Sequence, residues 1–193
     1  EISECLVGSE MCIRDSNFPT HTIRNATGNY QEITKYNRRI DSMKDYLGIS
    51  GKAAIVTGSG RGIGQGVAEA LAEYGVRVMV CDINDENGEA VVAGIRAKGG
   101  TAEYCHCDIM QTEQINALIA RTVEVFGTVD FLINNGGGGE APRDFFDLDD
   151  ARFDHYVRLN LYSAFAAIRA AFPYMRKQNS GRIVNISSGY ALC

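Results

Sequence analysis

The segment 57–64, which reads TGSGRGIG, has the residue types and the spacing to hold a phosphate group. A short apolar run precedes it and an amphipathic pattern follows, so the loop is expected to lead from a strand into a helix. Glycines allow a tight turn and a close approach of the backbone to a ligand, and the first turn of a helix offers free N–H groups. Gly58, Gly62 and Gly64 fit T-G-x-x-x-G-x-G, and the segment fits neither G-x-G-x-x-G nor G-x-x-x-x-G-K-[ST]. The segment predicts a pyrophosphate site, with a purely structural turn as the alternative.

A carboxylate, Asp82, follows the next apolar run, eighteen residues after Gly64. At the end of a second strand, a carboxylate can accept a hydrogen bond from a ribose 2′-hydroxyl and repels a 2′-phosphate. The position therefore favours NAD over NADP, although Arg61 in the glycine loop could contact a phosphate. A helix-capping or loop aspartate is the alternative.

Apolar runs that favour β-strands alternate with helical patterns from residue 53 onward. The runs lie at 54–56, 76–81, 131–133 and 182–186. Helical spacing relates Ile63, Val67, Leu71 and Tyr74, and also Ile115, Leu118, Ile119, Val123 and Phe126. Near-continuous apolar strands with helices between them are typical of a parallel sheet covered on both faces. We expect an α/β fold with a Rossmann-like, doubly wound parallel sheet.

A longer helix is expected from about Leu148 to Lys177, with an interruption at Pro173. The apolar residues at helical spacing along it are Phe153, Val157, Leu161, Phe165 and Ile168. It is also rich in alanine, at Ala164, Ala166, Ala167, Ala170 and Ala171.

From about Gly51 to Cys193, the sequence resembles the short-chain dehydrogenase/reductase family, in the single-domain form that carries T-G-x-x-x-G-x-G. Asp108 matches the family's aspartate at the adenine ring. The segment 134–137 (NNGG) matches the family's N-N-A-G, with Gly136 in place of the alanine. The resemblance implies that the cofactor is bound by Thr57, Gly58, Ser59, Arg61, Gly62, Ile63, Gly64, Asp82, Asp108, Ile109, Asn134, Asn135 and Gly136.

Two further matches concern catalysis. Asn160 matches the asparagine of the family's catalytic helix, which supports a water-linked proton relay. Ser188 matches the catalytic serine, which is the second of the pair and hydrogen-bonds the substrate oxygen. The family's catalytic tyrosine lies about thirteen residues after this serine, with a lysine four residues later. Tyr190 is too close to Ser188 to take that place, so we expect the chain as given, which ends at Cys193, to lack both groups and to be inactive.

The resemblance implies an NAD(P)-dependent oxidoreductase that interconverts a secondary alcohol and a ketone. Its relatives act on 3-oxoacyl thioesters, sugar acids or steroids, and nothing in the sequence chooses among these small molecules. The glycine run at 136–139 could form a roomy wall beside the site or a plain loop. The long helix resembles the family's oligomer-interface helix, so we expect a homo-tetramer or homo-dimer. We also expect the last strands and helices of the domain to lie beyond residue 193, which leaves one sheet edge unpaired.

Three alternatives to a dehydrogenase are compatible with a glycine loop. The first is a non-catalytic dinucleotide-binding protein. The second is a sugar-nucleotide epimerase, although Gly62 and Gly64 fit its T-G-x-x-G-x-x-G pattern poorly. The third is a methyltransferase, which does not need the pair Asn160 and Ser188.

The first fifty residues differ from the rest, because they are polar and show no sustained period. We therefore expect an N-terminal extension at 1–50 and a dinucleotide-binding domain at 51–193. The segment 11–16 (MCIRDS) resembles a translated sequencing adaptor, and Arg38-Arg39 could be encoded by a ribosome-binding sequence before Met43. The hypothesis is that residues 1–42 are a translation artefact, with a genuine disordered extension as the alternative.

Composition excludes several classes of protein. Lys+Arg 19 against Asp+Glu 24 gives a net charge of −5, so no basic field is present to attract nucleic acid. No apolar stretch approaches the roughly 18 residues that span a bilayer. The six cysteines favour reduced thiols in a cytoplasmic protein. The run 105–108 (CHCD) lacks a second ligand pair at zinc-site spacing, so no metal site is predicted.

Overall fold

The computed structural model describes residues 22–24, 30–32, 45, 47–139, 146 and 148–188. The chain divides into two compact units, Glu1–Tyr46 and Leu47–Cys193. In the first unit, β1 (Thr22–Arg24) and β2 (Tyr30–Glu32) form an antiparallel pair that the sequence pattern does not predict. Several residues used in the sequence argument lie outside the described residues: Cys5, 11–16, Arg38, Arg39, Met43, Tyr190 and Cys193.

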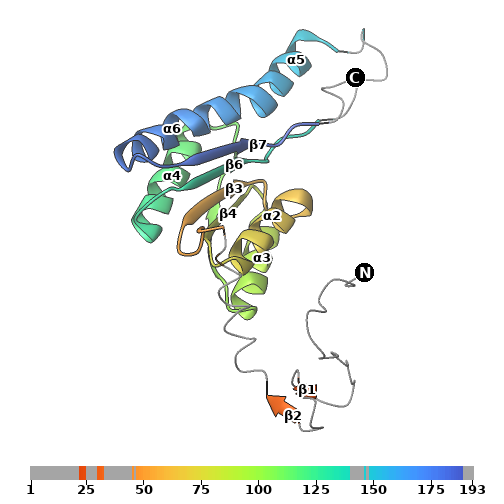
Figure 1. Ribbon diagram of the computed structural model, residues 1–193. Coiled ribbons are helices and arrows are strands. Elements are labelled where there is room, and N and C mark those ends of the chain that lie inside the picture. Colours follow the sequence, from red (N-terminus) through yellow and green to blue (C-terminus); the bar gives the residue numbers. More distant parts are fainter. Residues whose placement is uncertain are drawn as a thin grey trace. The chain divides into compact units, whose positions relative to one another are not determined.

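A five-stranded parallel sheet forms the centre of the second unit (Figure 1). Its strands are β3 (Ala53–Thr57), β4 (Arg77–Asp82), β5 (Thr101–His106), β6 (Phe131–Asn134) and β7 (Arg182–Asn185). They lie in the order β5-β4-β3-β6-β7, and every neighbouring pair is parallel. All residues of β3 are buried, which explains why this central strand is a continuous apolar run.

Helices cover both faces of the sheet. Helices α2 (Gly62–Glu73) and α3 (Asp85–Ala97) pack on one face, and α4 (Thr112–Phe126) and α6 (Ser163–Lys177) pack on the other (Figure 1). Successive residues of β3, such as Ala54 and Ile55, point alternately into the two apolar cores that result. The predicted doubly wound α/β fold is confirmed.

The periodic apolar residues mark the buried face of α2 only in part. Val67 and Leu71 are partly buried against the core, whereas Ile63 is 68% exposed and Tyr74 is 38% exposed. The fully buried positions of the helix are Gly64, Ala68 and Ala72. Small residues face the sheet because the glycine loop brings the start of α2 very close to the end of β3. At Gly64, an added Cβ would lie 2.3 Å from the carbonyl oxygen of Gly58.

The long helix is continuous through Pro173, so the expected interruption there is wrong. Pro173 lies inside α6 with its ring on the exposed side, where the loss of one N–H donor does not end the helix. The irregularity lies earlier, because α5 (Asp150–Val157) leads into the π-helical turn η2 (Arg158–Tyr162), which leads into α6. Among the described residues, no helix has both the length and the apolar character that crossing a membrane requires.

Candidate functional site

The expected site residues gather at the carboxyl edge of the sheet, around β3 and β6. These two strands are neighbours, but the chain runs outward from β3 through β4 and β5 before it returns to β6. Loops that follow two such strands diverge and leave a crevice, which is where ligands bind in open α/β sheets. The glycine loop follows β3, and Asn135 and Gly136 follow β6.

The glycine loop is packed tightly on one side and open on the other. An added Cβ on Gly58 would lie 2.8 Å from the Cα of Gly136, so the two loops are in backbone contact. Gly62 has a φ of +61°, and a Cβ added there would meet nothing within 4 Å. The space beside Gly62, at the first turn of α2, is therefore open to a ligand.

The start of α2 is free to take an anion. Its N-cap residue, Arg61, makes no side-chain capping bond, and the first turn holds no acidic residue. In contrast, the Asn84 side chain caps α3, whose first turn contains Asp85 and Glu86. The first N–H groups of an α-helix have no partner within the helix, so those of α2 fit a pyrophosphate.

Ser59 links the glycine loop to the ends of β3 and β4 by hydrogen bonds. Its side chain is fully buried, and its hydroxyl donates to the carbonyl oxygen of Val56 at 2.7 Å. The backbone N–H of Cys81 donates to the Ser59 hydroxyl at 3.0 Å, and the N–H of Ser59 donates to the carbonyl oxygen of Cys81. Ser59 therefore fixes the shape of the loop, and its contribution to cofactor binding stays a prediction.

Thr57 joins the loops that follow β3 and β6. Its hydroxyl accepts hydrogen bonds from the backbone N–H groups of Asn135 (3.1 Å) and Gly136 (2.9 Å). The Asn135 side-chain amide donates to the carbonyl oxygens of Thr57 and Gly58, both at 3.0 Å. The side chain of Ile109 reaches the same place, because a Cβ on Gly136 would lie 2.8 Å from its Cδ1.

Asp82 is held by two backbone donors. One oxygen accepts from the N–H of Gly60 at 2.8 Å, and the other accepts from the N–H of Asn84 at 3.0 Å. Gly60 is absent from the predicted site residues, but its added Cβ would lie 2.8 Å from the Asp82 carboxylate. Gly60 is the second of the four glycines in the loop, and its lack of a side chain could have signalled this close approach.

Asp108 also turns its carboxylate toward its own loop. One oxygen accepts from the N–H of Met110 at 2.9 Å, and the Gln114 side chain accepts from the N–H of Asp108 at 2.8 Å. These hydrogen bonds lie within the segment that follows β5. The structure shows this local bonding, and a contact of Asp108 with an adenine ring stays a prediction.

Asn160 lies within the π-helical turn, and its side chain is hydrogen-bonded to the glycine-rich segment at 136–139. Its side-chain oxygen accepts from the N–H of Gly138 at 2.8 Å, and its amide donates to the carbonyl oxygen of Gly138 at 2.9 Å. The turn shifts the helical bonding, because the N–H of Ser163 bonds the carbonyl oxygen of Arg158. Such turns are frequent at functional sites.

Ser188 lies at the carboxyl end of β7, where it is exposed. Shortly before Ser188 in the chain, hydrogen bonds connect the carboxyl ends of β6 and β7. The Asn134 amide donates to the Asn185 side chain at 2.8 Å, and the N–H of Ile186 donates to the carbonyl oxygen of Asn134. The sheet therefore brings the predicted serine to the same edge as Asn134 and its cofactor segment.

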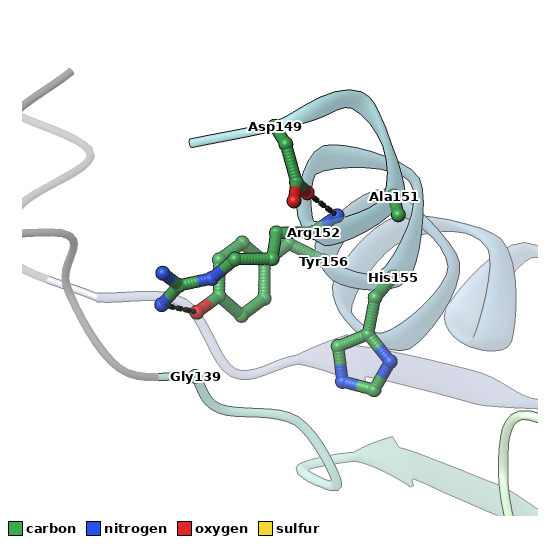
Figure 2. A pocket seen from close by; sticks show the side chains of 6 residues that line it. All are labelled: Gly139, Asp149, Ala151, Arg152, His155 and Tyr156. Atoms are coloured by element: carbon green, nitrogen blue, oxygen red, sulfur yellow. Dashed lines mark hydrogen bonds between the residues drawn. The ribbon is translucent and has the colours of Figure 1, made fainter. Parts of the chain in front are cut away.

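A hollow of about 620 Å³ lies beside the glycine-rich segment (Figure 2). Its lining residues are Gly139, Asp149, Ala151, Arg152, His155 and Tyr156. Figure 2 shows the Arg152 side chain alongside Tyr156, with the guanidinium 3.4 Å from the phenol oxygen. The Asp149 carboxylate caps α5 by accepting from the N–H of Arg152. Of these lining residues, only Gly139 belongs to a segment that the sequence singles out as part of the site, the glycine run at 136–139.

The cysteines beside the site are free thiols. Cys81 and Cys107 are buried, and Cys105 is half-buried. The hydrogen bond between Cys81 and Cys107 raises the pKa of Cys81, to which burial adds, and lowers the pKa of Cys107. Within the described part of the chain, no cluster of His, Cys, Asp or Glu could hold a metal ion.

Known proteins show the same sequence pattern and architecture. A family profile described as short chain dehydrogenase matches residues 52–193. The chain is 40% identical over 145 residues to 7alpha-hydroxysteroid dehydrogenase of Escherichia coli (strain K12), a match that covers 75% of this chain and 56% of that protein.

Two solved structures have a similar fold. A structure of 7α-hydroxysteroid dehydrogenase complexed with NADH and 7-oxo glycochenodeoxycholic acid matches with a TM-score of 0.72 and 39% identity, over 75% of this chain and 56% of that chain. A metagenomic short-chain oxidoreductase in complex with NADP matches with a TM-score of 0.70 and 35% identity, over 72% of this chain and 63% of that chain. The chain thus spans little more than half the length of the curated relative it matches.

Proposed function

The chain belongs to the short-chain dehydrogenase family, and on that premise we propose that the protein is an NAD-dependent oxidoreductase that interconverts a secondary alcohol and a ketone. The observation that carries the proposal is the open glycine loop that follows β3, at the point where the connections after the neighbouring strands β3 and β6 run in opposite directions. The uncapped start of α2 would hold the pyrophosphate there, with Gly62 facing it. The solved relatives described with NADH and NADP support a nicotinamide dinucleotide as the ligand.

The preference for NAD rests on Asp82. Its carboxylate is fixed by the N–H groups of Gly60 and Asn84, and its remaining lone pairs can accept bonds from ribose hydroxyls. A 2′-phosphate would place a second negative charge beside this carboxylate. Arg61 is the opposing feature, because an exposed guanidinium in the same loop could pair with that phosphate.

Ser188 and Asn160 would serve the reaction in different ways. The Ser188 hydroxyl would donate a hydrogen bond to the oxygen of the substrate carbonyl, which becomes more negative as the ketone is reduced. Asn160 would support a water-linked proton relay, and its side chain keeps the glycine-rich segment in place. A bound nicotinamide would supply or accept the hydride.

The substrate would be a small molecule that carries a secondary hydroxyl or a ketone. The relative whose name and described ligand give a 7α-hydroxysteroid and a 7-oxo steroid supports this reaction type. The hollow beside Gly139 supports the view that the glycine run forms a roomy wall. A steroid, a sugar acid and a 3-oxoacyl thioester stay open as substrates.

We propose a homo-oligomer in which a second copy covers the long helix. Large apolar residues along one side are exposed, namely Phe153, Val157, Leu161, Phe165 and Phe172. The start of the helix carries Asp149, Asp150 and Asp154 together with Arg152 and Arg158, and its end carries the basic residues Arg169, Arg176 and Lys177. Two antiparallel copies would bring the basic end of one helix to the aspartates of the other, around the apolar stripe. The free thiols support a cytoplasmic location, where cysteines stay reduced.

The proposed dinucleotide site is tested by Gly62→Asp. Aspartate tolerates a positive φ better than most residues, and no atom lies within 4 Å of the added Cβ. Its negative charge would occupy the proposed pyrophosphate site, so the Kd for NADH, measured by the fluorescence of the reduced nicotinamide, should rise at least about tenfold.

Gly99→Asp is the matched control for this experiment. Gly99 also has a positive φ (+84°) and open space around it, but it lies after α3, away from the glycine loop. Its NADH affinity should equal that of the wild type. Equal affinity in the Gly62→Asp variant would reject the proposed site.

The role of the serine is tested by Ser188→Ala, with Ser187→Ala as its neighbouring control. The loss of a hydrogen-bond donor to a developing oxyanion typically lowers turnover by about 10²–10³-fold. We expect that loss in kcat for Ser188→Ala and near-normal kcat for Ser187→Ala, assayed with secondary alcohols that include hydroxysteroids, in a longer chain that also carries the family's tyrosine and lysine. Equal effects of the two substitutions would contradict the assignment.

A further inference from the structure

Tyr104, near the end of β5, packs against α3 beside the ribose end of the proposed cofactor site. An added Cβ on Gly88 of α3 would lie 2.1 Å from Cε2 of Tyr104, so the ring rests directly on the helix backbone. This contact carries the Tyr104 hydroxyl to the turn between β4 and α3. There the hydroxyl lies 2.9 Å from the carbonyl oxygen of Asp82 and 2.6 Å from a carboxylate oxygen of Asp85.

The hydroxyl is a hydrogen-bond donor at every ordinary pH. Burial, together with the nearby Asp85 carboxylate, raises the pKa of Tyr104, so the phenol stays protonated. Hydrogen bonds from Tyr104 and then from His106 lower the pKa of Asp85, so the carboxylate stays an acceptor. One phenolic proton therefore serves two acceptors that lie on either side of the turn Asp82–Asp85.

This turn also fixes the Asp82 side chain. The N–H of Asn84 donates to one carboxylate oxygen of Asp82, and the N–H of Gly60 donates to the other. The backbone carbonyl of Asp82 accepts from Tyr104 and from the N–H of Cys107. The orientation of the carboxylate thus depends on a backbone that Tyr104 holds from the side opposite the glycine loop.

We propose that Tyr104 is a positioning residue for dinucleotide selectivity, which acts by holding Asp82 in place for the ribose 2′-hydroxyl. The inference rests on the proposed function, because it presumes that Asp82 contacts the ribose. A less firmly held carboxylate makes a weaker bond to the 2′-hydroxyl and repels a 2′-phosphate less. Loss of the Tyr104 hydroxyl therefore shifts the ratio of the two affinities, whereas general damage to the site lowers both.

The experiment measures Kd for NADH and for NADPH by nicotinamide fluorescence. Tyr104→Phe keeps the ring on Gly88 and removes only the hydroxyl. The Kd for NADH should rise about threefold to tenfold, the expected effect of one hydrogen bond, while the Kd for NADPH stays level or falls. Tyr74→Phe removes a phenol at the far end of α2 and should leave both values unchanged.

Two further variants separate the possible causes. Asp82→Asn should itself lower the preference for NADH, and adding Tyr104→Phe to it should change the ratio no further. In Asp85→Ala, the Tyr104 hydroxyl can still donate to the carbonyl oxygen of Asp82. The ratio of the Kd values for NADH and NADPH should therefore stay within about twofold of the wild-type value.

The outcomes distinguish this inference from the proposed function. An unchanged ratio in Tyr104→Phe, or an equal shift in Asp85→Ala, would overturn the role of Tyr104 while Asp82→Asn still changes the selectivity. If Asp82→Asn leaves the ratio unchanged, or neither dinucleotide binds, the proposed cofactor preference itself fails. Circular dichroism of each variant confirms that a change in Kd is not a loss of fold.

Discussion

The buried Thr57 hydroxyl joins the two halves of the proposed cofactor site, together with the Asn135 side-chain amide. Thr57 is 4% exposed, and it accepts hydrogen bonds from two consecutive N–H groups, those of Asn135 and Gly136. Without this oxygen, two backbone donors would lie at a closed loop-to-loop contact with no acceptor. Leaving a buried donor unpaired costs about 1–3 kcal/mol, so the residue should matter for stability as well as for binding.

We predict that Thr57→Val, a substitution of similar shape, lowers the free energy of unfolding by about 1–3 kcal/mol and weakens NADH binding. Urea denaturation and the nicotinamide titration measure the two effects. Thr122→Val is the matched control, because the Thr122 hydroxyl only donates to the carbonyl oxygen of Leu118 within α4. If Thr122→Val lowers the free energy of unfolding as much as Thr57→Val does, the contact between the two loops has no special importance for stability.

At the scale of elements, α3 contains glycine where a better helix former would be expected. Gly88 is buried beneath the Tyr104 ring, whereas Gly94 has open space around it. Glycine in a helix is about 0.8–1.0 kcal/mol less favourable than alanine. At Gly88 this disadvantage is offset by the close packing of β5 on α3, and at Gly94 the structure shows no such contact.

The two glycines should therefore respond in opposite ways to alanine. We expect Gly88→Ala to displace the Tyr104 ring and to destabilise the protein by about 1–3 kcal/mol. Gly94→Ala should stabilise it by up to about 1 kcal/mol. Thermal unfolding of both variants measures the difference, and the same sign for both would refute the packing argument.

At the scale of the whole molecule, α5 and η2 contain no buried residue. The alanine-rich side of α6 faces inward, where Ala166, Ala167 and Ala171 pack into the core. The large apolar side chains of the long helix point the other way. A stripe of this kind is unusual on the surface of a monomer, which is the basis of the proposed homo-oligomer.

If the proposed homo-oligomer forms through this stripe, we predict that Phe165→Glu, which places a charge in its middle, lowers the mass of the protein in solution. Phe165 is 52% exposed, so the substitution should leave the core intact. Sedimentation velocity measures the mass in solution. Tyr74→Glu, at an exposed position on α2, is the control and should keep the wild-type mass. A Phe165→Glu variant of unchanged mass would disprove the interface.

The main features of the fold could be predicted because their signals are local. Apolar runs mark the strands, and the glycine spacing marks the loop between β3 and α2. The π-helical turn at Arg158–Tyr162 could not be predicted, because its residues have an ordinary helical pattern. The most buried residues of α2 were also missed, since close packing against the strand end favours glycine and alanine there, although the predicted Val67 and Leu71 do pack against the core.

The sequence by itself determined the α/β class, the family and the residue types of the site, because these follow from side-chain periodicity and from motifs a few residues long. Only the tertiary structure decided which groups those residues touch. Thr57 and Asn135 are separated by 78 positions, and Asp82 and Tyr104 by 22, yet both pairs are in hydrogen-bond contact. Such contacts depend on the order of strands in the sheet, and strand order arises from the packing of the whole chain rather than from any local pattern.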